Sequence, residues 1–123
     1  MKNYLLLWVA AALLLLSASV VAHSDAKPQH GGLLQSKYDL NFELVRAADG
    51  VRLYVDDHGE PVATEPLSGK IMLLAKSGKT EAPLTSAGPG QWFAPGLNIA
   101  DGAKVVVTLT NINNDVMTVR FSF

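Results

Sequence analysis

Apolar and polar side chains alternate along two neighbouring stretches in the first half of the chain. Apolar residues occupy every second position within residues 38–46, and residues 51–56 repeat the pattern. This alternation is typical of a β-strand with one buried face, because successive side chains point to opposite sides of the pleat. The Asp49-Gly50 pair between the two stretches is a strong signal for a tight turn. We therefore predict an antiparallel hairpin at the centre of the fold.

Later stretches continue this pattern of short strands. Residues 104–110 (KVVVTLT) are rich in β-branched residues, and residues 116–123 place their apolar side chains on one face. Residues 33–35 predict a short first strand. Residues 80–85 predict another strand, in which Pro83 indicates an edge position because proline cannot donate a backbone hydrogen bond.

Residues 70–76 are apolar at nearly every position. That pattern fits a strand covered on both faces or a short buried helix. The short length and the closing Ser77-Gly78 turn favour the strand. No stretch after residue 22 has a convincing helical period. About seven short strands with regular turn signals therefore predict an all-β fold, a small antiparallel β-sandwich of Ig-like architecture.

The first 22 residues have the layout of a secretory signal peptide. Lys2 gives a short positive region, residues 4–16 are almost wholly apolar, and Val20 and Ala22 suit the −3 and −1 positions of a cleavage site. The alternative is an uncleaved membrane anchor, for which an apolar span of about 18 residues is at the lower limit. The small-residue motif favours cleavage after Ala22.

These features divide the chain into a signal peptide (1–22), a polar, mobile N-terminal arm (23–32) and a β-sandwich domain (33–123). No comparably long apolar run follows residue 22, so we expect no stable membrane insertion after cleavage. The absence of cysteine excludes disulfides and thiol chemistry, and a small exported domain without disulfides fits a bacterial periplasm best. The net charge of −1 gives no electrostatic footprint for nucleic acid.

Enzyme signatures are missing from the sequence. It contains no G-x-S-x-G, no H-E-x-x-H, no phosphate-binding loop and no dinucleotide fingerprint. A Ser-His-Asp triad stays open, because such a triad is recognised by geometry and not by sequence position. Since nothing favours one, we expect a non-enzymatic protein.

The three histidines, with a neighbouring aspartate, are the candidate metal ligands. Cleavage after Ala22 would make His23 the N-terminal residue, whose α-amino group and ring nitrogen can chelate one ion together. His30 follows on the same arm, and His58 lies beside Asp57 in the polar turn after the central hairpin. Neutral nitrogen donors suit copper, nickel or zinc better than calcium or magnesium. If the arm and the turn meet at one end of the sandwich, these residues could hold one transition-metal ion.

Other interpretations of the notable residues remain open. Histidines in arms and turns are often only solvated, and the glycines after His30 also fit a close backbone approach. Met72 and Met117 could bind Cu(I), but their apolar strands favour packing in the core. Trp92 and Phe93 lie in a stretch rich in Gly and Pro. They form either an exposed interaction platform or a plug at one end of the sandwich, and the plug is favoured.

Two short motifs give the chain a family resemblance. His30-Gly31-Gly32 precedes an alternating strand, and a second strand runs into a turn with the sequence DHGEPV, residues 57–62. In these motifs the chain resembles the HGG-containing β-sandwich domain of periplasmic adaptor subunits of heavy-metal RND efflux systems, and small exported relatives of that domain. The resemblance implies a periplasmic β-sandwich linked to the handling of copper, zinc, cobalt or nickel. The sequence has no counterpart of the helical hairpin, lipoyl-like and barrel parts of a complete adaptor.

The sequence therefore leads to two hypotheses about function. The first is a non-enzymatic periplasmic protein that binds copper, zinc or another divalent transition metal in heavy-metal homeostasis or efflux. Its candidate partner is an efflux-pump or cell-envelope protein. The alternative is a metal-free interaction module that docks on such a complex through a sheet edge or through the Trp92-Phe93 stretch.

Overall fold

The structure, a computed structural model, describes residues 26–123 of the 123-residue chain. The expected signal peptide and His23 lie outside the described residues. Residues 26–123 contain nine β-strands and no helix. In chain order the strands are β1 (Leu33–Lys37), β2 (Leu40–Ala47), β3 (Gly50–Asp57), β4 (Glu60–Pro61), β5 (Leu67–Ala75), β6 (Gly78–Ser86), β7 (Gln91–Pro95), β8 (Lys104–Asn111) and β9 (Val116–Ser122).

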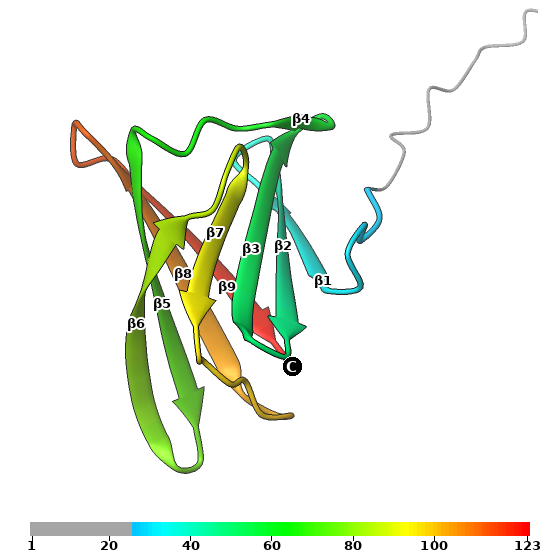
Figure 1. Cartoon of the computed structure of the whole chain (residues 1–123), viewed down its shortest axis with the longest axis vertical. Coiled ribbons are helices and arrows are strands. Elements are labelled where there is room, and N and C mark those ends of the chain that lie inside the picture. Colours follow the sequence, from blue (N-terminus) through cyan, green and yellow to red (C-terminus); the bar gives the residue numbers. More distant parts are fainter. Residues whose placement is uncertain (1–25) are drawn as a thin grey trace, which may run out of the picture.

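The strands form one antiparallel sheet in the order β1-β2-β3-β7-β6-β5-β8-β9, with the short β4 paired to β3. β6 joins the two halves, because most of its length pairs with β5 whereas Thr85 and Ser86 pair with β7. The sheet curls until β1 and β9, the two ends of this order, come into contact (Figure 1). The predicted all-β, antiparallel class is confirmed. The observed sheet differs from the expected sandwich of about seven strands, because it has nine strands and nearly closes into a barrel.

The turn between β1 and β2 holds the seam of this nearly closed barrel. The Tyr38 hydroxyl accepts a hydrogen bond from the Thr118 N–H on β9 at 3.1 Å, and Lys37 Nζ donates to the Thr118 carbonyl at 2.7 Å. Tyr38 and Asp39 both have positive φ, 55° and 58°, which is uncommon for residues other than glycine. Side chains, and not a continuous backbone ladder, therefore bridge the two terminal strands.

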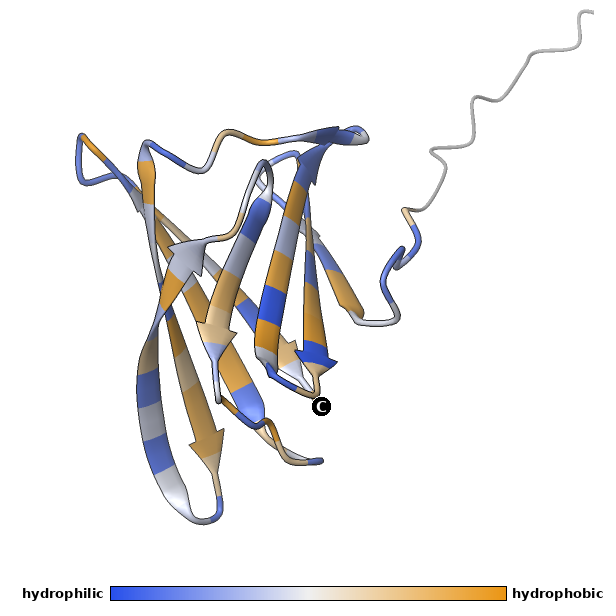
Figure 2. Cartoon of the chain, viewed as in Figure 1, coloured by the Kyte–Doolittle hydropathy of each residue, from blue (hydrophilic) through white to orange (hydrophobic). Residues whose placement is uncertain are grey.

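The inside of the barrel is the apolar core that the alternating pattern predicts. Phe42, Leu44 and Leu53 are completely buried, and the hairpin between them forms as expected. Hydropathy bands alternate along the strands (Figure 2), and the core residues on them are apolar. β8 and β9 contribute the other side of the core through Val105, Val107, Leu109, Val119 and Phe121.

Only one face of β5 is buried, contrary to the expectation of a strand covered on both faces. Ile71 and Leu73 point into the core, whereas Leu74 is 42 % exposed. Met72 lies on the same outer face and is half-buried, so the prediction that it packs in the core is wrong. Met117 packs against the core from β9.

The Gly- and Pro-rich stretch around Trp92 is a strand, β7, paired with β3 and with the end of β6. Trp92 is completely buried, and its Nε1 has no hydrogen-bond partner among residues 26–123. Phe93 points to the other face, where Arg52 lies over its ring at 4.3 Å. Of the two interpretations left open by the sequence, an exposed platform does not apply to Trp92, which is part of the core.

Candidate functional site

A row of polar side chains crosses the outer face of the sheet between β2, β3 and β7. The strand register pairs Glu43 with Tyr54 and Tyr54 with Gln91. One pleat further along, Asn41 pairs with Asp56 and its amide donates to the Asp56 carboxylate at 3.0 Å. Residues paired in antiparallel strands project on the same face, so the hairpin places these groups together.

The segment before β1 folds over this row and is tied to Glu43. The Glu43 carboxylate accepts hydrogen bonds from the backbone N–H groups of Gln29, His30 and Gly32, at 2.8, 2.8 and 2.9 Å. It also meets Nδ1 of His30 at 3.0 Å. Glu43 is only 3 % exposed although it points away from the barrel core. The end of the expected mobile arm, residues 29–32, is thus fastened to β2.

The two glycines of the His-Gly-Gly motif allow this close approach for different reasons. Gly31 has φ +73°, in the left-handed region that glycine adopts without a steric penalty. A Cβ on Gly32 would collide with the Leu44 carbonyl oxygen and with the Val45 side chain at 2.8 Å. A side chain at either position would disturb the path of the segment that carries His30.

His30 is held by two contacts of different kinds. Its ring stacks on the Tyr54 ring with centroids 3.6 Å apart and planes 4° apart. Its Nδ1 is paired with the Glu43 carboxylate, and its Nε2 makes no protein hydrogen bond within the described residues. These two contacts fix the orientation of the ring. Because the side chain is 43 % exposed, the ring is still open to solvent.

The environment of Glu43 favours its charged form. Burial acts to raise the pKa of Glu43, but hydrogen bonds from Gly32, the His30 ring and Gln29 outweigh it, so the pKa lies below its usual value. The carboxylate is therefore a negative acceptor beneath His30 at neutral pH.

His58 lies in a different setting, in the tight turn that joins β3 to β4. His58 and Gly59 both have positive φ, 51° and 93°, as a two-residue type I′ turn requires. The side chain is 83 % exposed and its Nδ1 lies 2.7 Å from the carboxylate of Asp57. That hydrogen bond, followed by the charge of Asp57, raises the pKa of His58. Asp56 closes the same turn by accepting the Gly59 N–H at 3.1 Å.

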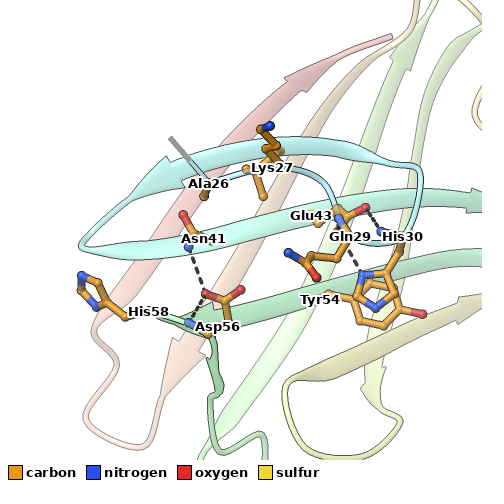
Figure 3. Close-up of a pocket in the computed structure, with 11 residues that line it drawn as sticks. Ala26, Lys27, Gln29, His30, Asn41, Glu43, Tyr54, Asp56 and His58 are labelled. Carbon is orange, nitrogen blue, oxygen red and sulfur yellow. Dashed lines mark hydrogen bonds and ion pairs between the residues drawn. The ribbon is translucent and has the colours of Figure 1, made fainter. Parts of the chain in front are cut away.

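One shallow pocket of about 280 Å³ connects the two histidines, with Ala26, Gln29 and Asp56 also in its lining. Figure 3 shows His58 at one end, the stacked His30 and Tyr54 at the other, and Asp56 between them. Between Tyr54 and Asp57 the extended strand spans about 10 Å, and His58 follows in the turn. Two ligands of one ion have their donor atoms within about 4 Å of each other, since zinc–nitrogen bonds are about 2 Å long.

The structure thus brings His30 and His58 to opposite ends of one pocket (Figure 3). No group of three His, Asp or Glu side chains in residues 26–123 is arranged to hold an ion. Asp57, the last residue of β3, pairs with His58 and is not part of the pocket lining. His23 lies outside the described residues, three residues before Ala26.

Sequence reasoning missed Glu43 and Tyr54, the two residues that hold His30. A signal for them exists in the central hairpin. Once the turn is placed at Ala48 and Asp49, the register pairs Glu43 with Tyr54 on the outer face. A carboxylate opposite a tyrosine on the polar face of a hairpin, just after a His-Gly-Gly segment, points to such a cluster.

Comparison of the chain with protein-family models, with curated proteins and with solved structures finds no match. In the part of the chain that the structure describes, no helix is long and apolar enough to cross a membrane.

Proposed function

We propose that the protein binds a divalent transition metal or copper, as a non-enzymatic periplasmic protein of heavy-metal homeostasis or efflux. The observation that carries the proposal is the His30–Glu43 pair, with Nδ1 and Oε1 3.0 Å apart. A carboxylate on one ring nitrogen is the usual setting of a metal-binding histidine, because it orients the ring and raises the basicity of the other nitrogen.

A single imidazole does not make a tight site, so further donors are needed. His23 is the first candidate, because cleavage after Ala22 would give it both an α-amino group and a ring. Ala26, three residues after His23, lines the same pocket as His30. Nitrogen donors of this kind favour copper, nickel or zinc.

His58 is the weaker candidate ligand. Its pKa is raised by the hydrogen bond with Asp57, so a proton competes with a metal ion for the ring more strongly than usual. Its exposed position also leaves the ring free to adopt several rotamers, which lowers the affinity of any site that it completes.

Calorimetric titration with Cu(II) and Zn(II) tests the proposal on the mature protein that starts at His23. Three comparison proteins are needed: one with an extra residue ahead of His23, His30→Gln, and His58→Gln as the matched control. We expect His30→Gln to weaken binding at least tenfold, and His58→Gln to weaken it less. Loss of copper binding on adding the extra residue would identify the amino-terminal chelate as part of the site.

Two outcomes would contradict the proposal. The first is the absence of binding in the parent protein at micromolar metal concentrations. The second is binding that His30→Gln and the extra residue both leave unchanged, since neither the ring nor the terminal amine would then be a ligand.

The alternative, a metal-free docking module, has less support. Trp92 is buried, so docking would have to use a sheet edge or the half-buried Phe93 on the outer face. One free edge in the described residues is that of β6 between Gly78 and Leu84, which pairs only with β5. Lys79 and Pro83 lie on it, and lysine and proline are the residues by which edge strands resist pairing with another chain. We therefore retain metal binding as the proposal.

A further inference from the structure

Three backbone N–H groups and the His30 ring surround the Glu43 carboxylate. Oε1 faces the Gln29 N–H at 2.8 Å and His30 Nδ1 at 3.0 Å. Oε2 accepts from the N–H groups of His30 and Gly32 at 2.8 and 2.9 Å. A carboxylate offers about four lone-pair sites, and three of them accept backbone N–H bonds here, which favours the ionised form of Glu43.

This arrangement determines which ring nitrogen of His30 carries a hydrogen atom. An ionised carboxylate can only accept, so Nδ1 must be the donor in the pair with Oε1. In the neutral imidazole, Nε2 then keeps the free lone pair, which is the electron pair that a metal ion needs. The stacked Tyr54 ring and the backbone bonds at Gln29, His30 and Gly32 hold the ring plane in place.

We infer that Glu43 is the positioning residue of a metal site at His30, because it selects the tautomer that binds through Nε2 and fixes the ring on the wall of the pocket. The inference rests on the proposed function and assigns the role of the buried carboxylate within it. Partners of this kind change metal affinity by about 10- to 100-fold when they are removed.

The Glu43→Gln variant tests this role while keeping the size of the side chain. A glutamine amide has one acceptor oxygen, and its NH₂ group would face two of the four donors that now meet the carboxylate. Glu81→Gln, at an exposed position on β6, is the control for the same chemical change elsewhere. Two measurements are made on the parent and both variants: ¹⁵N NMR of the His30 ring in the metal-free protein, and Zn(II) titration.

We expect the parent to show the Nδ1–H tautomer and to bind Zn(II) through Nε2. In Glu43→Gln the tautomers should mix and the Zn(II) affinity should fall about 10- to 100-fold, while Glu81→Gln behaves as the parent. The His30 ring signals of the parent test the inference even if Glu43→Gln does not fold. An Nε2–H tautomer, or Zn(II) bound through Nδ1, would overturn it.

The results separate this inference from the proposed function. If the parent binds Zn(II) at His30 and Glu43→Gln binds equally well, the positioning role is wrong and the proposed function stands. If the parent binds neither Zn(II) nor Cu(II), the proposed function fails, and the role of Glu43 in metal binding fails with it.

Discussion

The two ends of the pocket hold a histidine in opposite ways. At the His30 end, a buried carboxylate, a stacked tyrosine and three backbone N–H groups fix the ring and the chain that carries it. At the His58 end, one exposed aspartate meets an exposed ring on a turn. Similar residue types therefore give a rigid, pre-organised group at one end and a solvated one at the other. The difference is that residues 29–32 cover the Glu43 carboxylate, whereas the Asp57 carboxylate is exposed.

The largest expected difference between the ends follows from removing each carboxylate. Glu43→Ala leaves three backbone N–H groups without their charged acceptor, and we expect a loss of stability on the order of 3 kcal/mol. Asp57→Ala should leave the stability unchanged within error, because both partners are exposed. Urea unfolding of the two variants and the parent measures both effects. Equal losses at the two ends would remove the distinction between them.

The second comparison uses one glycine near each histidine, Gly32 after His30 and Gly59 after His58. A Cβ at Gly32 meets the Leu44 carbonyl oxygen, so Gly32→Ala should destabilise the protein by about 2 kcal/mol, as overpacking commonly does. Gly59 has open space around it, and Gly59→Ala should cost about 1 kcal/mol for its left-handed backbone alone. Amide exchange should also speed up at residues 29–32 in Gly32→Ala only. Unchanged exchange there would contradict the close-approach argument.

A smaller effect is expected from removing the aromatic stack at the His30 end. Tyr54→Val keeps the β-propensity of the strand and should destabilise the protein by about 1 kcal/mol, the usual size of an aromatic pair. The hydrogen bonds to Glu43 remain, so the Nδ1–H tautomer of His30 should be retained. Unfolding midpoints and ¹⁵N NMR of the ring check the two parts. A changed tautomer would mean that the stack, and not Glu43, controls the ring.

The smallest expected differences are in the pH dependence of the stability, which has opposite signs at the two ends of the pocket. The pKa of Glu43 lies below its usual 4.5, so its stabilisation is complete above pH 4.5 and is lost as pH falls through the folded-state pKa. The pKa of His58 lies above its usual 6.5, so its pairing with Asp57 stabilises fully below pH 6.5 and is lost as pH rises through the folded-state pKa. Unfolding midpoints across pH should show Glu43→Gln converging with the parent in acid. His58→Gln should differ only slightly from the parent at low pH and should converge with it in weak alkali.

Much of the fold can be predicted from alternation, because a half-buried strand repeats its environment every two residues. The central hairpin, the strands β8 and β9 and the edge position of Pro83 are confirmed in this way. β7 was missed because Gly and Pro mask a strand whose two apolar core residues, Trp92 and Ala94, are separated by one position. Local signals cannot reveal the seam either, since Tyr38 meets a residue 80 positions away.

The candidate site is harder to predict than the fold. His30 was identified because imidazole is a common ligand, but its partners depend on how the arm folds back over the hairpin. Glu43 reads as an ordinary outward-facing residue of an alternating strand, and only the return of residues 29–32 buries it. That His30 and His58 share one ion stays a prediction, and the structure places the two rings at opposite ends of one pocket (Figure 3).

Trp92 gives this protein a built-in optical probe. Of the two tryptophans, Trp8 lies in the expected signal peptide, so a chain cleaved after Ala22 would carry Trp92 alone. Its indole is completely buried among apolar groups, and its Nε1 has no hydrogen-bond partner in the described part of the chain. Such an indole emits at short wavelength and shifts to longer wavelength when water reaches it. Fluorescence should therefore follow the opening of the barrel core directly, without a label.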